Sequence, residues 1–352
     1  TVVVLSNGAP VELPWTRMPA ALVEAYLGGQ AGGSALVDVL FGEQDPGGRL
    51  PETFPIDQRD ILADRAFPGQ PRQVQYRENL YVGYRQFVTT GQRVRFPFGH
   101  GLSYTEFELG RAEVPAGTIA AGQNVSVSVP VENIGRRAGS TVVQVYVRQI
   151  SPPVHRPERE LRGFAKVRLG PGERITAEIP LDATAFSIWD RATGAWQTVA
   201  GAYELLIGFS SADIRSVARI DVRSEFAPEP LRAPRRLAAD DTEFADLLGR
   251  PVPRAEPLLP FTRTSQVADL AQTALGRQVQ KALVSAARRR LESAVADPLF
   301  ERLLDAVVMQ MPLRNLVTMS GGRLSWRMLD GLVHALNGRW FAAVRSWVSR
   351  PG

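Results

Sequence analysis

Hydrophobic residues in the first hundred positions alternate between short apolar runs and stretches with helical spacing. Residues 1–6 (TVVVLS) predict a buried strand, and residues 34–41 predict a helix that Ser34 caps and Gly42 ends. Residues 18–24 can begin a helix, whereas residues 22–27 are apolar enough to be a short buried strand instead, and the pattern leaves both open. Alternating strands and helices over 1–105 predict a partial α/β layer: a truncated parallel sheet with flanking helices.

From residue 106 the period changes to two. Residues 123–132 (QNVSVSVPVE) and 141–148 (TVVQVYVR) alternate strictly between polar and apolar side chains. A series of about seven short strands separated by turns is typical of an all-β sandwich, which we predict for residues 106–224. The other predicted strands are 174–181, 196–199, 202–208 and 217–222.

Residues 225–264 are rich in proline and arginine and predict a linker, extended over 226–236. Residues 265–352 predict an α-helical extension, which forms either a small bundle or a cover over the sandwich. Helical spacing spans 265–308 and 324–348, and Ser320-Gly-Gly322 interrupts it. The predicted apolar stripes consist of Leu270, Ala274, Val279, Leu283, Leu291, Leu303, Leu304 and Val307.

Composition narrows the possible classes of function. The 352 residues are 44% hydrophobic and 22% charged, an ordinary globular balance. The absence of cysteine excludes disulfides and thiolate chemistry. The presence of three histidines argues against a multi-histidine metal centre. We therefore expect no metal and no cofactor. No apolar run approaches the roughly 18 residues that a membrane-spanning helix needs.

The net charge of +5 lies entirely in the last third of the chain. Residues 1–224 hold 23 basic and 23 acidic side chains, whereas residues 225–352 hold 18 and 13. Only Lys166 and Lys281 are lysines, and the arginines are spread over all segments. A nucleic-acid site would concentrate them on one face, so we expect no nucleic-acid partner. Membrane contact is not expected either, although Arg288-Arg-Arg290 keeps a membrane-surface role open as an alternative.

Three ordered motifs resemble glycoside hydrolase family 3, the family of many β-glucosidases. They are residues 28–55 (GGQAGGSALVDVLFGEQDPGGRLPETFP), 76–85 (YRENLYVGYR) and 96–107 (FPFGHGLSYTEF). The sandwich is similar to the fibronectin type III-like domain of that family, and the helical part to an extension of some bacterial members. The chain departs from the family pattern at Ala31, where an acidic residue is usual, and at Asn79.

The resemblance implies a retaining exo-glycosidase, in which two carboxyl groups lie about 5–5.5 Å apart. In this family the nucleophile is an aspartate of an N-terminal barrel, and the acid/base glutamate precedes the strand with which this chain begins. Neither has a matching position here, so we expect no catalytic residues in this chain. The chain is expected to be a C-terminal piece and inactive alone. No signal-peptide inference is drawn, and a cytoplasmic location is the working expectation.

Two residues are candidates for the rim of the substrate cleft: Tyr76 and Glu78. Tyrosine rings can stack on sugars, although the aromatic residues at 76–87 also suit a domain-interface core. For Glu78 an ion pair with Arg77 competes with a functional role. His100, between two glycines, is expected to be a hydrogen-bonded structural histidine, and Asp45 to accept hydrogen bonds from local backbone donors in its turn.

The expected function is hydrolysis of terminal β-D-glucosyl or related residues, so the expected partner is a β-linked glucoside or oligosaccharide. Two alternatives stay open. One is a carbohydrate-binding or interaction module without catalysis, because a sandwich alone does not define a function. The other is a family 3 hydrolase for xylosides, arabinosides or glycosylated natural products. The sequence makes no statement on oligomeric state.

Overall fold

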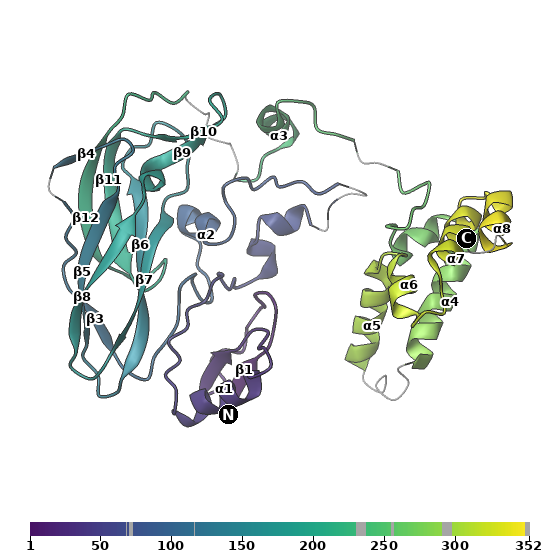
Figure 1. Ribbon diagram of the computed structural model, residues 1–352, viewed down its shortest axis with the longest axis horizontal. Coiled ribbons are helices and arrows are strands. Elements are labelled where there is room, and N and C mark those ends of the chain that lie inside the picture. Colours follow the sequence, from purple (N-terminus) through teal and green to yellow (C-terminus); the bar gives the residue numbers. More distant parts are fainter. Residues whose placement is uncertain are drawn as a thin grey trace. The chain divides into compact units, whose positions relative to one another are not determined.

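A computed structural model describes residues 1–67, 69, 73–115, 117–229, 237–254, 257–290 and 298–348, the side chains of 290, 298 and 299 excepted. The chain forms two compact units (Figure 1). The first consists of Thr1–Pro68 with Gln75–Val252, and the second of Gly69–Val74 with Pro253–Gly352. The predicted fold class is confirmed, because an α/β part, a β-sandwich and C-terminal helices follow one another along the chain.

The α/β part is a pair of parallel strands followed by a helix. β1 (Val2–Leu5) pairs with β2 (Ala21–Glu24), so the ambiguous segment 18–27 contains a strand. The N-cap residue of α1 (Gly32–Phe41) is Ala31, and the expected Ser34 cap is wrong because the helix begins before Ser34, whose hydroxyl donates backwards to the Ala31 carbonyl. Gly42 ends the helix as predicted, in the left-handed conformation with φ of 80°.

No residue of α1 is buried, and Phe41 is 80% exposed. Both strands leave their side chains only partly covered. The α/β part therefore presents apolar surface that a complete layer of this class would bury. Short elements follow it: the 3-10 turns η1 (Gln58–Asp60) and η2 (Ala63–Arg65), and helix α2 (Tyr84–Thr90).

The β-sandwich consists of a five-stranded sheet, in the order β4-β12-β11-β6-β7, and a three-stranded sheet, in the order β3-β5-β8. A hairpin of β9 (Ser187–Asp190) and β10 (Ala195–Thr198) lies beyond η3 (Ala183–Phe186). The strand bounds are Phe107–Leu109 (β3), Thr118–Ala120 (β4), Val125–Asn133 (β5), Gly139–Gln149 (β6), Glu160–Leu169 (β7), Arg174–Leu181 (β8), Gly201–Gly208 (β11) and Ile214–Arg223 (β12).

Alternation along β5 shows why these residues form a sandwich. Val125, Val127, Val129 and Val131 are all buried and occupy alternate positions, so they point into the core between the sheets. Val145, Leu205 and Ile207 reach the same core from the other sheet, and Ile179 and Leu181 reach it from β8, which pairs with β5.

Strand β7 was not among the predicted strands. Gly163 interrupts its apolar alternation for a packing reason, since a Cβ there would lie 2.6 Å from Leu181 Cδ2 and 2.9 Å from Ile179 Cγ2. Its outward positions carry Lys166 and Arg168, which makes the segment polar on average. A short helix was also not predicted: α3 (Asp241–Leu248) lies inside the expected linker 225–264, and of the extended stretch 226–236 only 226–229 lie within the described residues.

The second unit is helical. It contains η4 (Val267–Gln272), α4 (Ala274–Arg290), α5 (Pro298–Gln310), α6 (Asn315–Met319), α7 (Trp326–Leu336) and α8 (Trp340–Val348). Of the described helices, none is long and apolar enough to cross a membrane. The core residues are Phe261, Val267, Leu270, Val308, Leu313, Leu329 and Leu336.

The predicted apolar stripes are only partly right. Leu270, Val279, Leu283 and Leu304 belong to the core or pack against it. By contrast, Leu303 is 59% and Val307 55% exposed, and Ala274 is exposed too, while Leu291 lies outside the described residues. α5 packs against α4 on one side. This covered side is narrower than the apolar stripe that the sequence predicts for the helix.

A buried charge cluster joins helix α2 to the sandwich. Glu160 of β7 forms ion pairs with Arg156 (2.9 Å), Arg162 (3.0 Å) and Arg85 of α2 (3.7 Å). Burial raises the pKa of Glu160, but the guanidinium groups of Arg162, Arg156 and Arg85 outweigh it, so the net pKa lies below the usual range. The carboxylate therefore stabilises the folded chain as long as it stays ionised.

Truncating Leu205 tests the sandwich core. Leu205→Ala should lower the free energy of unfolding by about 2–5 kcal/mol, because the side chain is fully buried and its removal leaves a cavity. Ile175→Ala on β8, where the side chain is 37% exposed, is the matched control and should cost less than about 1 kcal/mol. Urea unfolding followed by circular dichroism measures both, and equal losses would contradict the assigned core.

Replacing Glu160 tests the charge cluster. Glu160→Gln should cost roughly 3 kcal/mol at neutral pH, because it leaves buried arginines unpaired. Since the folded pKa is depressed, the stabilisation is present above the unfolded pKa of about 4.3 and is lost as the pH falls through the folded value. The difference between wild type and variant should therefore shrink in acid.

Urea unfolding over a pH series measures this difference. The control Glu132→Gln removes one partner of an exposed pair with Arg174 at 3.9 Å and should change stability by less than about 1 kcal/mol. A difference for Glu160→Gln that is independent of pH would contradict an ionised Glu160.

Candidate functional site

Polar side chains gather where the two parallel strands end. Ser6 follows β1, and Glu24 is the last residue of β2. The Ser6 hydroxyl donates to the Tyr26 carbonyl at 3.1 Å, and the Tyr26 amide donates to Glu24 Oε1 at 2.8 Å. In open α/β sheets, ligands bind outside the carboxyl ends of the strands, so this edge is the first place to look for binding chemistry.

The chemistry at this edge is a phenol beside a carboxylate. Tyr26 Oη and Glu24 Oε2 are buried, and neither has a hydrogen-bond partner among the residues that the structure describes. Burial, together with the charges of Glu24 and Glu52, raises the pKa of Tyr26 to about 12, so its hydroxyl remains a donor. Tyr26 also has φ of +48°, unusual for a residue other than glycine. This edge therefore holds a donor and an acceptor that are both covered and unpaired among the described residues.

Sequence reasoning missed Glu24 and Tyr26 as a site. The available signal was their position directly after an apolar run, which places them at a strand end once residues 21–24 are assigned as a strand. The sequence pattern fits both helix and strand in that segment, so it does not identify this edge.

The two predicted rim residues differ in their exposure to solvent. Tyr76 is 71% exposed, whereas Glu78 is 4% exposed. Arg77, the neighbour of Glu78, pairs with Asp241 of α3 at 2.6 Å and lies 5.0 Å from the centre of the Phe244 ring, so an ion pair of Glu78 with a described residue is not observed. Only Tyr76 therefore has the accessibility that a cleft-rim residue needs.

The other aromatic residues of this motif pack inside the first unit. Tyr81 is buried and hydrogen-bonds His155, and Tyr84 stacks on Phe98 with ring centres 4.6 Å apart. The Tyr84 hydroxyl oxygen also accepts a hydrogen bond from the Leu161 amide at 2.7 Å. These residues form an interface with the sandwich, the structural alternative that their spacing allowed.

His100 stacks on Phe96, with ring centres 5.3 Å apart and planes inclined by 19°. Burial and the nearby charge of Arg49 lower its pKa, so the ring is neutral at physiological pH, while Asp213 opposes this shift weakly. Its backbone carbonyl accepts the Leu50 amide at 2.8 Å. No side-chain hydrogen bond of His100 to a described residue supports the expected bonded histidine; stacking holds it instead.

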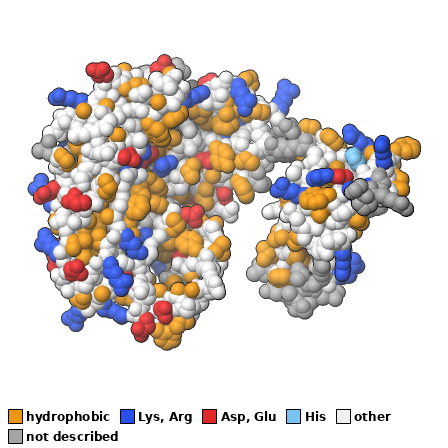
Figure 2. All heavy atoms as spheres, viewed as in Figure 1, with side chains coloured by type: hydrophobic (Ala, Val, Ile, Leu, Met, Phe, Trp, Pro, Cys, Tyr) orange, Lys and Arg blue, Asp and Glu red, His pale blue; other side chains and the backbone are white. Residues whose placement is uncertain are grey.

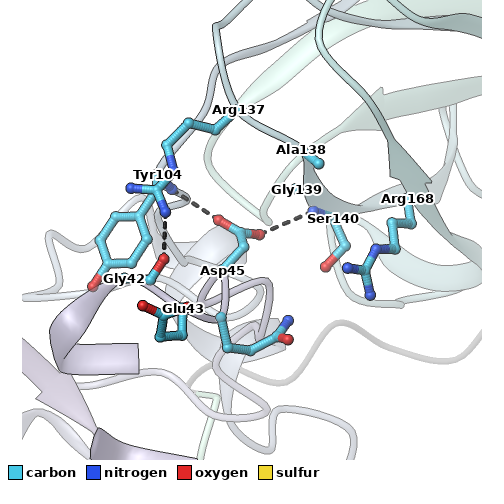
Figure 3. A pocket seen from close by; sticks show the side chains of 10 residues that line it. Gly42, Glu43, Asp45, Tyr104, Arg137, Ala138, Gly139, Ser140 and Arg168 are labelled. Atoms are coloured by element: carbon cyan, nitrogen blue, oxygen red, sulfur yellow. Dashed lines mark hydrogen bonds between the residues drawn. The ribbon is translucent and has the colours of Figure 1, made fainter. Parts of the chain in front are cut away.

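A polar pocket of about 290 Å³ lies between the α/β part and the sandwich (Figure 3). Asp45 is at its centre and accepts hydrogen bonds from the Ser103 hydroxyl (2.6 Å) and the amides of Tyr104 (2.8 Å) and Ser140 (2.9 Å). These donors are distant in sequence, so the expectation of local donors is wrong.

Arginine side chains complete this pocket. Arg137 donates to the Gly42 carbonyl and lies over the Tyr104 ring, 5.6 Å from its centre, and Arg168 lines the far side in Figure 3. Because its carboxylate accepts hydrogen bonds from donors of both domains, Asp45 is a structural carboxylate that joins them. Within the described residues, no cluster of three or more His, Asp or Glu side chains could hold a metal ion.

Comparison with known proteins agrees with this architecture. Residues 1–104 match the glycosyl hydrolase family 3 C-terminal domain, and residues 141–211 match the fibronectin type III-like domain. The chain is 39% identical over 341 residues to thermostable β-glucosidase B of Acetivibrio thermocellus, covering 96% of this chain and 40% of that protein. It is 43% identical over 223 residues to a probable β-glucosidase H of Emericella nidulans, covering 63% of this chain and 27% of that protein.

Solved structures give the same result. The β-glucosidase of Kluyveromyces marxianus in complex with glucose aligns with a TM-score of 0.60 at 40% identity, over 63% of this chain and 27% of that one. A family 3 β-glucosidase of Bifidobacterium adolescentis aligns with a TM-score of 0.60 at 33% identity, over 79% and 36%. The similar proteins are bacterial and fungal, so the expectation of a bacterial source stays a prediction.

This chain thus spans between about a quarter and two fifths of the length of the relatives it matches. Both family matches fall where the fold has the corresponding domain, the α/β part for the first and the sandwich for the second. The chain therefore contains the C-terminal domain of glycosyl hydrolase family 3 in residues 1–104 and a fibronectin type III-like domain around residues 141–211.

Proposed function

We propose that this chain works as the C-terminal part of a longer retaining β-glucosidase that removes terminal β-linked glucosyl residues. The similarity to thermostable β-glucosidase B, which extends over nearly the whole chain but covers only two fifths of that protein, carries this proposal. The glucose complex of the Kluyveromyces marxianus enzyme supports glucose as the sugar.

The incomplete burial of the α/β part supports a longer protein. A parallel two-stranded sheet and a helix without any buried residue leave an apolar face, including Val37 and Phe41, that further elements of the same domain would cover. In this proposal the carboxyl edge at Glu24 and Tyr26 lies in the layer that borders the substrate cleft.

The chemistry itself belongs to the longer protein in this proposal. Retaining hydrolysis needs a nucleophilic carboxylate and an acid/base carboxyl group about 5–5.5 Å apart. Asp45 is held by three donors and Glu78 is buried, so neither suits an attacking or proton-transferring role. The chain's own contribution is to form part of the cleft wall and to support it through the sandwich.

A non-catalytic carbohydrate-binding module is the second candidate. Trp189 and Trp196 favour it, because they face each other across the β9–β10 hairpin and are 53% and 52% exposed, with ring surface available for a sugar. The coding sequence upstream of Thr1 separates the two candidates: a barrel with an aspartate nucleophile supports the enzyme, and an unrelated domain supports the module.

The chain alone should not hydrolyse an aryl β-glucoside above a mock preparation, whereas the product of the complete reading frame should. The reason is that the proposed carboxylate pair is absent from residues 1–352. Release of the coloured aglycone, followed side by side for both proteins, measures this. Hydrolysis by the chain alone would contradict the proposed division, and an inactive complete product would contradict the proposed activity.

Tyr76 is proposed as the rim residue. In the complete enzyme, Tyr76→Ala should raise KM for an oligosaccharide about tenfold with little change in kcat, because stacking binds ground state and transition state alike. Tyr104→Ala, at the domain junction and 42% exposed, is the control and should leave KM within about twofold. A fall in kcat with unchanged KM would argue against a rim role.

A further inference from the structure

Helix α8 has two faces with different surroundings. One packs on α7: Ala343 is fully buried, and the Trp347 indole donates to the Met328 carbonyl at 3.2 Å. This contact is close, since a Cβ on Gly331 of α7 would lie 1.9 Å from Trp347 Nε1. The helix is therefore held in one rotational setting, which determines what its other face presents.

The other face is apolar and open. Trp340, Phe341, Val344 and Val348 follow the i, i+1, i+4, i+8 spacing of one helical stripe. Their exposed fractions are 55%, 97%, 52% and 74%, and together with Arg345 they line a shallow groove. We call these four side chains the α8 stripe.

The stretch of chain that contains the α8 stripe is rich in arginine. From residue 306 to 348 the chain carries five arginines (314, 323, 327, 339 and 345), and its one acid in this range, Asp330, pairs with Arg263 at 2.6 Å. Figure 2 shows orange and blue side chains on this unit with little red. Three of the six tryptophans in the whole chain, Trp326, Trp340 and Trp347, lie in the same stretch.

We propose that the α8 stripe inserts into the interfacial region of an anionic lipid surface, with Arg345 and other arginines of this stretch on the headgroups. An exposed aromatic stripe with a basic border is the pattern of helices that lie in the membrane interface without crossing it. Tryptophan prefers this zone, and anionic headgroups complement the arginines. A second copy of the chain is a poorer occupant, because the arginine-rich stretch carries charge of the same sign on both copies.

The α8 stripe differs from the membrane-surface site that the sequence leaves open, the arginine run 288–290. Arg288 of the run 288–290 is neutralised by Asp305 at 2.5 Å and Glu301 at 2.6 Å, so it has little charge to offer a membrane. The α8 stripe adds the apolar component that the run lacks. The proposal therefore replaces the earlier alternative and departs from the expectation of no membrane contact.

Co-sedimentation with vesicles tests the proposal on the full chain. Binding is expected to vesicles with about one third phosphatidylglycerol, to weaken with salt, and to be much weaker with phosphatidylcholine alone. Phe341→Ser should reduce binding about tenfold, because it removes a side chain that would be buried in lipid. Phe164→Ser on β7, where the side chain is 65% exposed, is the matched control and should leave binding unchanged.

A charge pair of variants completes the test. Arg345→Gln should lower binding to the anionic vesicles about fivefold, whereas Arg289→Gln on α4 should not. Failure of the wild type to sediment with the anionic vesicles would overturn the proposal, as would equal binding to both lipids or equal losses for Phe341→Ser and Phe164→Ser. Self-association abolished by Phe341→Ser, without vesicle binding, would assign the stripe to a second copy instead.

Discussion

The contact between the irregular segment 43–105 and strand β6 is the constraint on which the first unit depends. Asp45 accepts hydrogen bonds from donors on both sides of this contact, and Arg49 donates to the Gly101 carbonyl and to Thr141 Oγ1. Helix α1 buries none of its residues, so the α/β part has little core of its own with which to fix its position. Directional polar contacts to the sandwich fix the position of the α/β part instead. Backbone comes close enough here that a Cβ on Gly99 would lie 2.3 Å from Gln144 Oε1.

The sandwich could be predicted because its information is local. Two-residue alternation in β5 and β6 reports directly on which side chains face the core, and the structure places those strands within two residues of the predicted bounds. The sequence does not predict strand β7, because Gly163 interrupts its apolar alternation. A glycine stands there since Leu181 and Ile179 of another strand pack closely against it, and a local pattern does not contain this contact. For the same reason α3 was missed: Phe244 is buried against residues far away in the sequence.

The candidate site was less accessible to prediction than the fold. Tyr76 and Glu78 are neighbours in one motif, yet one is exposed and the other buried, and alternation does not distinguish these outcomes in an irregular segment. Glu24 and Tyr26 become a site only through the pairing of β1 with β2, which brings two strand ends together. Binding sites of parallel sheets form where long-range pairing brings strand ends together. Residue type alone indicates only which side chains could take part in such a site.

The tryptophan pair on the β9–β10 hairpin gives the protein an intrinsic optical label. The two indoles are 5.8 Å apart with planes inclined by 76°, an arrangement in which their electronic transitions couple. Coupled indoles produce a paired circular dichroism band that depends on this geometry and not on helix content. The hairpin therefore reports its own integrity independently of the helical unit, whose tryptophans lie on α7 and α8.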